Sequence, residues 1–247
     1  MNNNFQLLQK KYNQKSKDFD KKLLKVPLKE VGENLVYLPT LSKKYKLNIV
    51  YVERDKAFLR ESIAIQFMKS AEFFNKKGFI LKVYSTYRSL DEQKSKFITR
   101  YQSMKNSFPE KPRSELLKLA NTYTAGIPIL AAHTGGAAID VTLLDKNGKL
   151  LDFGVPYPHG DIESITDYPN FSKKVKGNRK ILKDGMEKYS FINYPFEYWH
   201  YSIGDVCATY LSGKKFAKFG PVNYNFKNER AVFPKQKKDY THFLKFL

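Results

Sequence analysis

Two short segments hold the residues of this sequence best suited to metal chemistry. Residues 132–140 read Ala-His-Thr-Gly-Gly-Ala-Ala-Ile-Asp, and residues 197–200 read Glu-Tyr-Trp-His. The chain has four histidines, and two of them, His133 and His200, lie in these segments. A catalytic zinc site uses three nitrogen, oxygen or sulfur ligands and leaves one position open for water. With Asp140 as the oxygen donor, the two histidines can hold one zinc ion per chain.

A second carboxylate lies close to this set, because Glu197 is three residues before His200. Zinc lowers the pKa of a bound water to about 7. A nearby glutamate can accept the proton of such a water and later protonate the leaving amine. The residue types therefore predict a zinc hydrolase in which Glu197 is the general base.

The local sequence indicates how these side chains are positioned. Two glycines follow His133, so the backbone there can adopt positive φ or approach another group closely. Residues 139–143 are typical of a strand that turns Asp140 to one face of a sheet. A proline precedes Glu197, and the residues beside His200 favour strands. We therefore expect a strand entered through a turn or bulge that brings both side chains to one site.

The spacing of these residues resembles that of the M15 zinc peptidases, a family that includes D,D-carboxypeptidases and D-alanyl-D-alanine dipeptidases. The resemblance lies in His-x-x-Gly-x-Ala-x-Asp at residues 133–140 and in Glu-aromatic-Trp-His at residues 197–200. It covers roughly residues 30–222. Further segments resemble the dipeptidase branch, namely residues 85–89, 152–156, 178–182 and 204–205.

The resemblance carries expectations about the site and the reaction. It implies that His133, Asp140 and His200 hold zinc. It also implies that Glu197 is the base and that Arg88 steadies the substrate carbonyl in the transition state. The implied substrate is a small peptide, D-alanyl-D-alanine, and the implied fold is the hedgehog/D,D-peptidase-like zinc fold.

The sequence departs from the family pattern at two places. Ala131 stands where the family usually has serine. The dipeptidases often have an acidic residue that holds the substrate amine after a Met-Gly or Phe-Gly turn, and Pro158 occupies that position here. Asp161 is the nearest acidic candidate, whereas His159 is expected to be a solvent-exposed loop residue. These differences bear on substrate preference more than on hydrolysis.

The composition bounds the architecture. The chain has 247 residues, of which 42% are hydrophobic and 15% aromatic, as expected for one folded domain with a sizeable core. We expect an N-terminal extension over residues 1–25 and a catalytic domain over residues 26–247. The expected fold is α+β, with a central antiparallel sheet, flanking helices and the zinc cleft on the open side of the sheet.

Secondary-structure signals are distributed along the whole chain. Hydrophobic periodicity predicts helices over residues 62–77, 90–104, 114–121, 178–188 and 208–211. Apolar runs predict strands over residues 35–38, 47–52, 79–84 and 139–143. Ser62 is expected to cap the first of these helices, and Gly78 to end it in the left-handed conformation.

Three further signals concern the surroundings of the site. Ser89 and Glu92 fit a capping box, so Arg88 is expected between the end of a strand and the start of a helix. The Asn-Gly pair at 147–148 predicts a hairpin with a return strand over residues 149–153. Residues 157–177 are expected to form a loop that lines the pocket.

The net charge is +20, from 44 lysines and arginines against 24 acidic residues. Such a charge raises nucleic-acid binding as a hypothesis. The lysines are, however, spread in pairs without an arginine-rich cluster, so no nucleic-acid partner is expected. The single cysteine, Cys207, excludes an internal disulfide. The sequence does not fix the oligomeric state.

The sequence shows no pattern typical of a targeting or membrane-spanning segment. No apolar run approaches the about 18 residues that a membrane span needs. The first residues lack a basic region followed by an apolar run, so we expect a cytoplasmic protein without a secretory signal.

Three alternatives remain open at this point. One is a zinc D,D-carboxypeptidase that acts on peptidoglycan stem peptides, which would need a less closed site. Another is a non-catalytic zinc-containing binding module, against which the presence of Glu197 and Arg88 argues. A basic nucleic-acid binder is the third, and it would show strongly salt-dependent binding.

Overall fold

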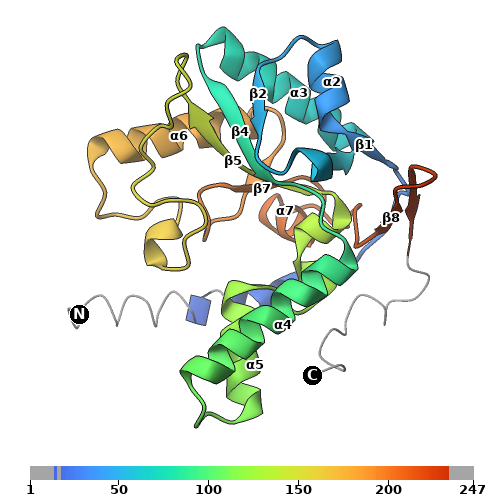
Figure 1. Ribbon diagram of the computed structural model, residues 1–247, viewed down its shortest axis with the longest axis vertical. Coiled ribbons are helices and arrows are strands. Elements are labelled where there is room, and N and C mark those ends of the chain that lie inside the picture. The colour runs from blue at the N-terminus through green and yellow to red at the C-terminus, as the bar shows by residue number, and fades with distance from the viewer. Residues whose placement is uncertain (1–13, 16–17, 234–247) are drawn as a thin grey trace.

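The computed structural model describes residues 14–15 and 18–233. Its centre is a five-stranded sheet in the order β2-β4-β5-β7-β6 (Figure 1). The strands are β2 (Ile49–Tyr51), β4 (Ile80–Ser85), β5 (Ala138–Leu144), β6 (Ile192–Asn193) and β7 (His200–Ser202). Only the edge pair of β2 and β4 is parallel, and the other neighbours are antiparallel. The predicted α+β class with a central, mainly antiparallel sheet is confirmed.

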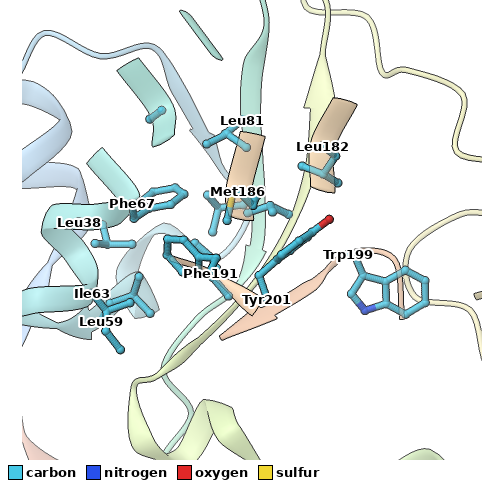
Figure 2. Packing of buried hydrophobic residues seen from close by; sticks show 14 of the residues in the cluster. Leu38, Leu59, Ile63, Phe67, Leu81, Leu182, Met186, Phe191, Trp199 and Tyr201 are labelled. Carbon is cyan, nitrogen blue, oxygen red and sulfur yellow. The ribbon is translucent and has the colours of Figure 1, made fainter. Parts of the chain in front are cut away.

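Two helices cover one face of this sheet. They are α3 (Glu61–Lys76) and α6 (Lys173–Glu187), which contact each other behind the strands (Figure 1). Phe67 of α3 and Met186 of α6 meet Leu81 of β4 in the hydrophobic core (Figure 2). Each such side chain stabilises the fold by about 1.5–3 kcal/mol when fully buried.

The central strand β5 is buried along its whole length, with helices on one face only. Every residue of β5 is buried. Ile139, Val141 and Leu143 belong to the core cluster with α3 and α6. Because side chains alternate along a strand, Asp140 and Thr142 face the opposite side of the sheet. The sheet thus presents Asp140 on the face that the helices leave open.

The remaining elements surround this open face. A helical pair, α4 (Leu90–Ser107) and α5 (Arg113–Tyr123), projects beyond the end of the sheet (Figure 1). Small elements complete the described chain: α2 (Leu38–Lys44), α7 (Val206–Leu211), and the strand pairs β1 (Leu35–Tyr37) with β3 (Phe58–Arg60) and β8 (Asn223–Asn225) with β9 (Arg230–Val232). Single 3-10 turns lie at η1 (Arg54–Lys56), η2 (Pro128–Leu130), η3 (Ala132–Gly135) and η4 (Ile162–Ser164).

The helix signals are largely confirmed, with one error in capping. Gly78 has φ +77° after α3, and the Ser89 side chain accepts a hydrogen bond from the Glu92 backbone N–H at 3.1 Å. Ser62 does not cap α3. Its backbone N–H instead donates to a Glu33 carboxylate oxygen at 3.0 Å, so a carboxylate from a preceding segment satisfies this helix terminus.

Two element predictions are wrong in extent. The return strand over residues 149–153 is reduced to a single bridge between Leu144 and Leu150. The chain leaves the sheet there because Phe153 turns inward and stacks on Tyr198, with ring centroids 5.1 Å apart. Helix α6 begins at Lys173 rather than at residue 178, because the Ser172 side chain caps it.

The predicted extension over residues 1–25 falls mostly outside the described residues. Residues 18–23 are helical, and Leu23 is buried against Val206 and Ala217. The boundary between extension and domain stays a prediction. Within residues 14–15 and 18–233, no helix has both the length and the apolar character to cross a membrane.

Candidate metal centre

Three side chains meet on the open face of the sheet. Asp140 of β5 is paired in register with His200 of β7, so the two residues lie directly across from each other. His133 comes from η3, immediately before β5. Gly136 ends this turn with φ +62°, a conformation that glycine adopts without steric cost. The reversal lets His133 fold back to Asp140.

The distances between these groups suit one metal ion. His133 Nε2 lies 3.3 Å from Asp140 Oδ1, and His200 Nδ1 lies 2.9 Å from the same oxygen. The three ligand atoms all lie within 4.8 Å of one another. Tetrahedral zinc with ligands at about 2.0–2.1 Å places neighbouring ligand atoms about 3.3 Å apart. The two nitrogens and one oxygen therefore fit a zinc ion in donor type and in spacing.

The side-chain atoms of His133 and Asp140 that point away from the candidate metal position form hydrogen bonds of their own. His133 Nδ1 is 2.6 Å from the Thr86 carbonyl oxygen, so the N–H on Nδ1 donates to Thr86 and Nε2 keeps its lone pair. The Tyr157 hydroxyl donates to Asp140 Oδ2 at 3.0 Å, which leaves Oδ1 directed toward the histidines. Outer contacts of this kind orient metal ligands.

The protonation states of two of these groups suit a metal site. Burial lowers the pKa of His133, more than Asp140 raises it. Burial alone would raise the pKa of Asp140, but His133 and His200 hold it well below its usual range. A neutral imidazole and an ionised carboxylate are the forms that bind metal. For His200 burial lowers the pKa, but the hydrogen bond to Asp140 and the nearby negative charges of Asp140 and Glu197 together outweigh it, and the pKa is raised.

Glu197 lies in the turn that joins β6 to β7. Its carbonyl accepts hydrogen bonds from the His200 backbone N–H at 3.1 Å and from Asn193 Nδ2 at 3.1 Å. Its carboxylate oxygen Oε2 lies 4.0 Å from His200 Nδ1, and 37% of its side chain is exposed. Burial raises the pKa of Glu197 to about 7, against the lowering effects of His200 and Arg88. A carboxylate poised near neutral pH suits a general base.

Arg88 lies between β4 and α4, as expected. Its guanidinium donates to Gln93 Oε1 at 2.7 Å and to Ser85 Oγ at 3.3 Å. Its backbone N–H donates to the His133 carbonyl at 3.1 Å. The positive charge of Arg88 lowers the pKa of both His133 and Glu197, so the guanidinium lies close enough to the candidate metal site to affect its electrostatics.

Aromatic side chains form one wall of this region. Tyr157 stacks on Tyr84 with centroids 4.2 Å apart and meets the edge of Trp199 at 5.4 Å. Trp199 is 3% exposed, so the residue between Tyr198 and His200 is part of the packed interior. No sequence motif marks Tyr157, because its contact with Asp140 depends on the path of an irregular loop.

A buried arginine holds the loop that carries His133. The Arg60 guanidinium, with no exposed surface, donates to the carbonyls of Gly135 at 2.6 Å and Gly220 at 3.1 Å. The Arg60 backbone N–H donates to the Gly136 carbonyl at 2.9 Å. The same guanidinium pairs with Glu30 at 3.3 Å. Sequence reasoning missed this residue, since no motif marks it.

The loop after β5 differs from expectation at His159. This residue is half-buried rather than exposed, with 25% of its side chain accessible. The loop folds back because Arg179 donates to the carbonyls of Glu163 at 2.8 Å and Ile165 at 2.6 Å. His159 therefore lies beside Asp161 and Glu163.

Comparison with known proteins gives one family and several relatives. The model of the peptidase M15 family described as D-ala-D-ala dipeptidase matches residues 42–219. The D-alanyl-D-alanine dipeptidase of Escherichia coli (strain K12) is 27% identical over 97 residues, which cover 39% of this chain and 50% of that protein. The protein of the same name from Synechocystis sp. is 34% identical over 89 residues, covering 30% of this chain and 34% of that protein. The matched stretches thus span half or less of these curated relatives.

Two solved structures show some likeness to this chain. The LD-carboxypeptidase LdcB aligns with a TM-score of 0.44 and 20% identity, covering 72% of this chain and 71% of that chain. A mutant of the vancomycin resistance D,D-pentapeptidase VanY in complex with Zn(II) aligns with a TM-score of 0.41 and 16% identity. That alignment covers 65% of this chain and 81% of VanY.

Proposed function

The chain belongs to the peptidase M15 family, in the group of D-Ala-D-Ala dipeptidases, and from this premise we propose that it hydrolyses D-alanyl-D-alanine in a zinc-dependent reaction. The observation that carries the proposal is the meeting of His133, Asp140 and His200 within 4.8 Å. A carboxylate of suitable pKa, that of Glu197, lies 4.0 Å from this group.

The proposed metal ligands are His133 Nε2, Asp140 Oδ1 and His200 Nδ1. When bound, zinc supplies a Lewis acid and a water of lowered pKa. The chain prepares the site for it, because Thr86 fixes the tautomer of His133 and Tyr157 fixes the orientation of Asp140.

Glu197 moves the proton in this proposal. It accepts a proton from the water that attacks the carbonyl carbon, and it delivers that proton to the nitrogen of the leaving D-alanine. Burial raises its pKa toward neutrality, which favours both the acceptance and the delivery of the proton near neutral pH. The turn between β6 and β7 holds it in place through the hydrogen bonds of its own carbonyl.

Arg88 stabilises the charge that develops on the carbonyl oxygen. Its guanidinium offers planar, charged N–H donors and is fixed by Gln93 and Ser85. A preorganised donor of this kind typically contributes about 10²–10³-fold to kcat.

The direct test is release of free D-alanine from D-alanyl-D-alanine by the zinc-loaded protein. An N-acylated D-Ala-D-Ala peptide is run in parallel. We expect turnover of the free dipeptide alone, its loss in Glu197→Gln, and its retention in Glu72→Gln, a matched change on the exposed surface of α3. Turnover of the acylated peptide would assign a carboxypeptidase instead, and full activity of Glu197→Gln would remove Glu197 as the base.

A further inference from the structure

A second set of metal-ligating side chains lies outside the site described above. In the loop after β5, His159 Nε2 is 3.7 Å from Glu163 Oε2 and 3.9 Å from Asp161 Oδ2. The three ligand atoms lie within 4.8 Å of one another. We propose that His159, Asp161 and Glu163 bind a second divalent metal ion.

An independent observation points to a missing ligand at this place. His159 Nε2 and Glu163 Oε2 are both buried atoms, and neither finds a hydrogen-bond partner among residues 14–15 and 18–233. An unpaired buried polar atom destabilises a fold because it gives up its hydrogen bonds to water without a replacement. At 3.7 Å the two atoms are too far apart to hydrogen-bond each other. A cation bound between them satisfies both at once.

The donor set indicates the kind of ion. One imidazole and two carboxylates can balance the charge of a divalent cation, and no thiolate is present. Mixed nitrogen and oxygen donors suit zinc and similar first-row metals. The distances from His159 Nε2 to the two carboxylates, 3.7 and 3.9 Å, exceed the about 3.3 Å between ligands on tetrahedral zinc, so side-chain rotations would draw the three ligand atoms closer around the ion.

The backbone that carries these ligands is already fixed. Arg179, 2% exposed, donates to the carbonyl of Glu163 at 2.8 Å and to that of Phe153 at 2.9 Å. The Ser164 hydroxyl donates to the His159 carbonyl at 2.7 Å. The site therefore binds metal without folding a loop first, which lowers the entropic cost of binding.

The position of this loop suggests what the second ion does. At one end, the Tyr157 hydroxyl contacts Asp140. At the other end, the Ser164 carbonyl accepts from the Tyr198 backbone N–H at 2.9 Å, directly after Glu197. The ion would be structural: it would hold a loop that contacts both a proposed ligand and the turn of the proposed base.

The test is a count of bound metal in the full chain. Each protein is saturated with Zn²⁺, dialysed and analysed by elemental analysis, and Co²⁺ titration followed by visible absorption gives a second readout. We expect two ions in the wild type and one in each of Glu163→Gln, His159→Gln and His200→Ala. The combination of Glu163→Gln with His200→Ala should bind none.

Asp167→Asn is the matched control, because Asp167 is 85% exposed in the same loop region; it should keep two ions. Circular dichroism and thermal unfolding verify that each variant is folded. Unchanged zinc content in both Glu163→Gln and His159→Gln would overturn the proposal. A wild type with one ion that His200→Ala removes would also overturn it, and lost activity in Glu163→Gln would then assign the cluster to substrate binding. The proposed function fails separately, through absence of D-alanine release.

Discussion

Replacement of Arg60 by methionine should destabilise the protein strongly and weaken zinc binding. The guanidinium is fully buried, pairs with Glu30, and donates to three backbone carbonyls, those of Glu33, Gly135 and Gly220. Removing one partner of a buried ion pair costs about 3–5 kcal/mol, because the other groups remain buried without partners. Methionine keeps much of the apolar volume, so the loss reports mainly on the polar contacts.

The expected loss in the free energy of unfolding is thus about 3–5 kcal/mol. For a chain of this size, each kcal/mol lowers Tm by about 2–4 °C, so Tm should fall by roughly 6–20 °C. Arg60→Lys should also lose stability, since one ammonium group cannot reach carbonyls in several directions. Urea unfolding followed by circular dichroism measures the free energy.

The control is Lys56→Met, which removes an ion pair with Glu92 in which 51% of the lysine side chain is exposed. Exposed pairs contribute about 0–1 kcal/mol, so this variant should unfold near the wild type. Arg60→Met should also raise the Kd for zinc, because the loop of His133 loses the side-chain hydrogen bond to the Gly135 carbonyl. A loss below about 1 kcal/mol would refute the argument that a buried, multiply bonded arginine is required here.

Four further outcomes follow from the site. Glu197→Gln should lower kcat by about 10²–10⁴-fold with zinc content by elemental analysis unchanged; loss of zinc would make Glu197 a ligand. Arg88→Ala should lower kcat by about 10²–10³-fold, with little change in KM, in steady-state assays. Tyr157→Phe should raise the zinc Kd in competition with a chelator by about 10–100-fold, whereas an unchanged Kd would deny Tyr157 an orienting role. Burial raises the pKa of Glu197 to about 7, and a base must be deprotonated. The pH profile of kcat/KM should therefore fall on the acid side at or below about pH 7, since a bound cation lowers a carboxyl pKa.

The parts of the site that the sequence predicts are those set by local signals. The strand around Asp140 follows from its apolar alternation, and the turn before His200 from a proline among strand-forming residues. Arg88 is placed by the capping box that begins at Ser89. In each case a few neighbouring residues determine the local conformation, so it can be predicted without knowledge of contacts between distant segments.

The parts that the sequence does not predict depend on contacts between distant segments. Ser62 is a suitable cap by type, but a Glu33 carboxylate takes its place. The Asn-Gly turn at 147–148 predicts a long hairpin, but burial of Phe153 against Tyr198 ends the pairing early. Local propensity is overridden here by packing and by satisfaction of buried polar groups.

Two buried arginines explain why irregular loops can support a site of this kind. Loop carbonyls have no neighbouring strand to donate to them, and buried ones still require partners. Arg60 supplies donors to the loop of His133, and Arg179 supplies donors to the loop of Glu163. Burial lowers the pKa of Arg179 to about 10, yet the guanidinium stays charged at neutral pH. A guanidinium has five N–H groups in one rigid plane and can donate hydrogen bonds to several carbonyls at once. A single buried arginine can therefore replace the backbone hydrogen bonds that a neighbouring strand would otherwise donate. This explains why an arginine, although costly to bury, lies next to each of the two clusters of candidate metal ligands.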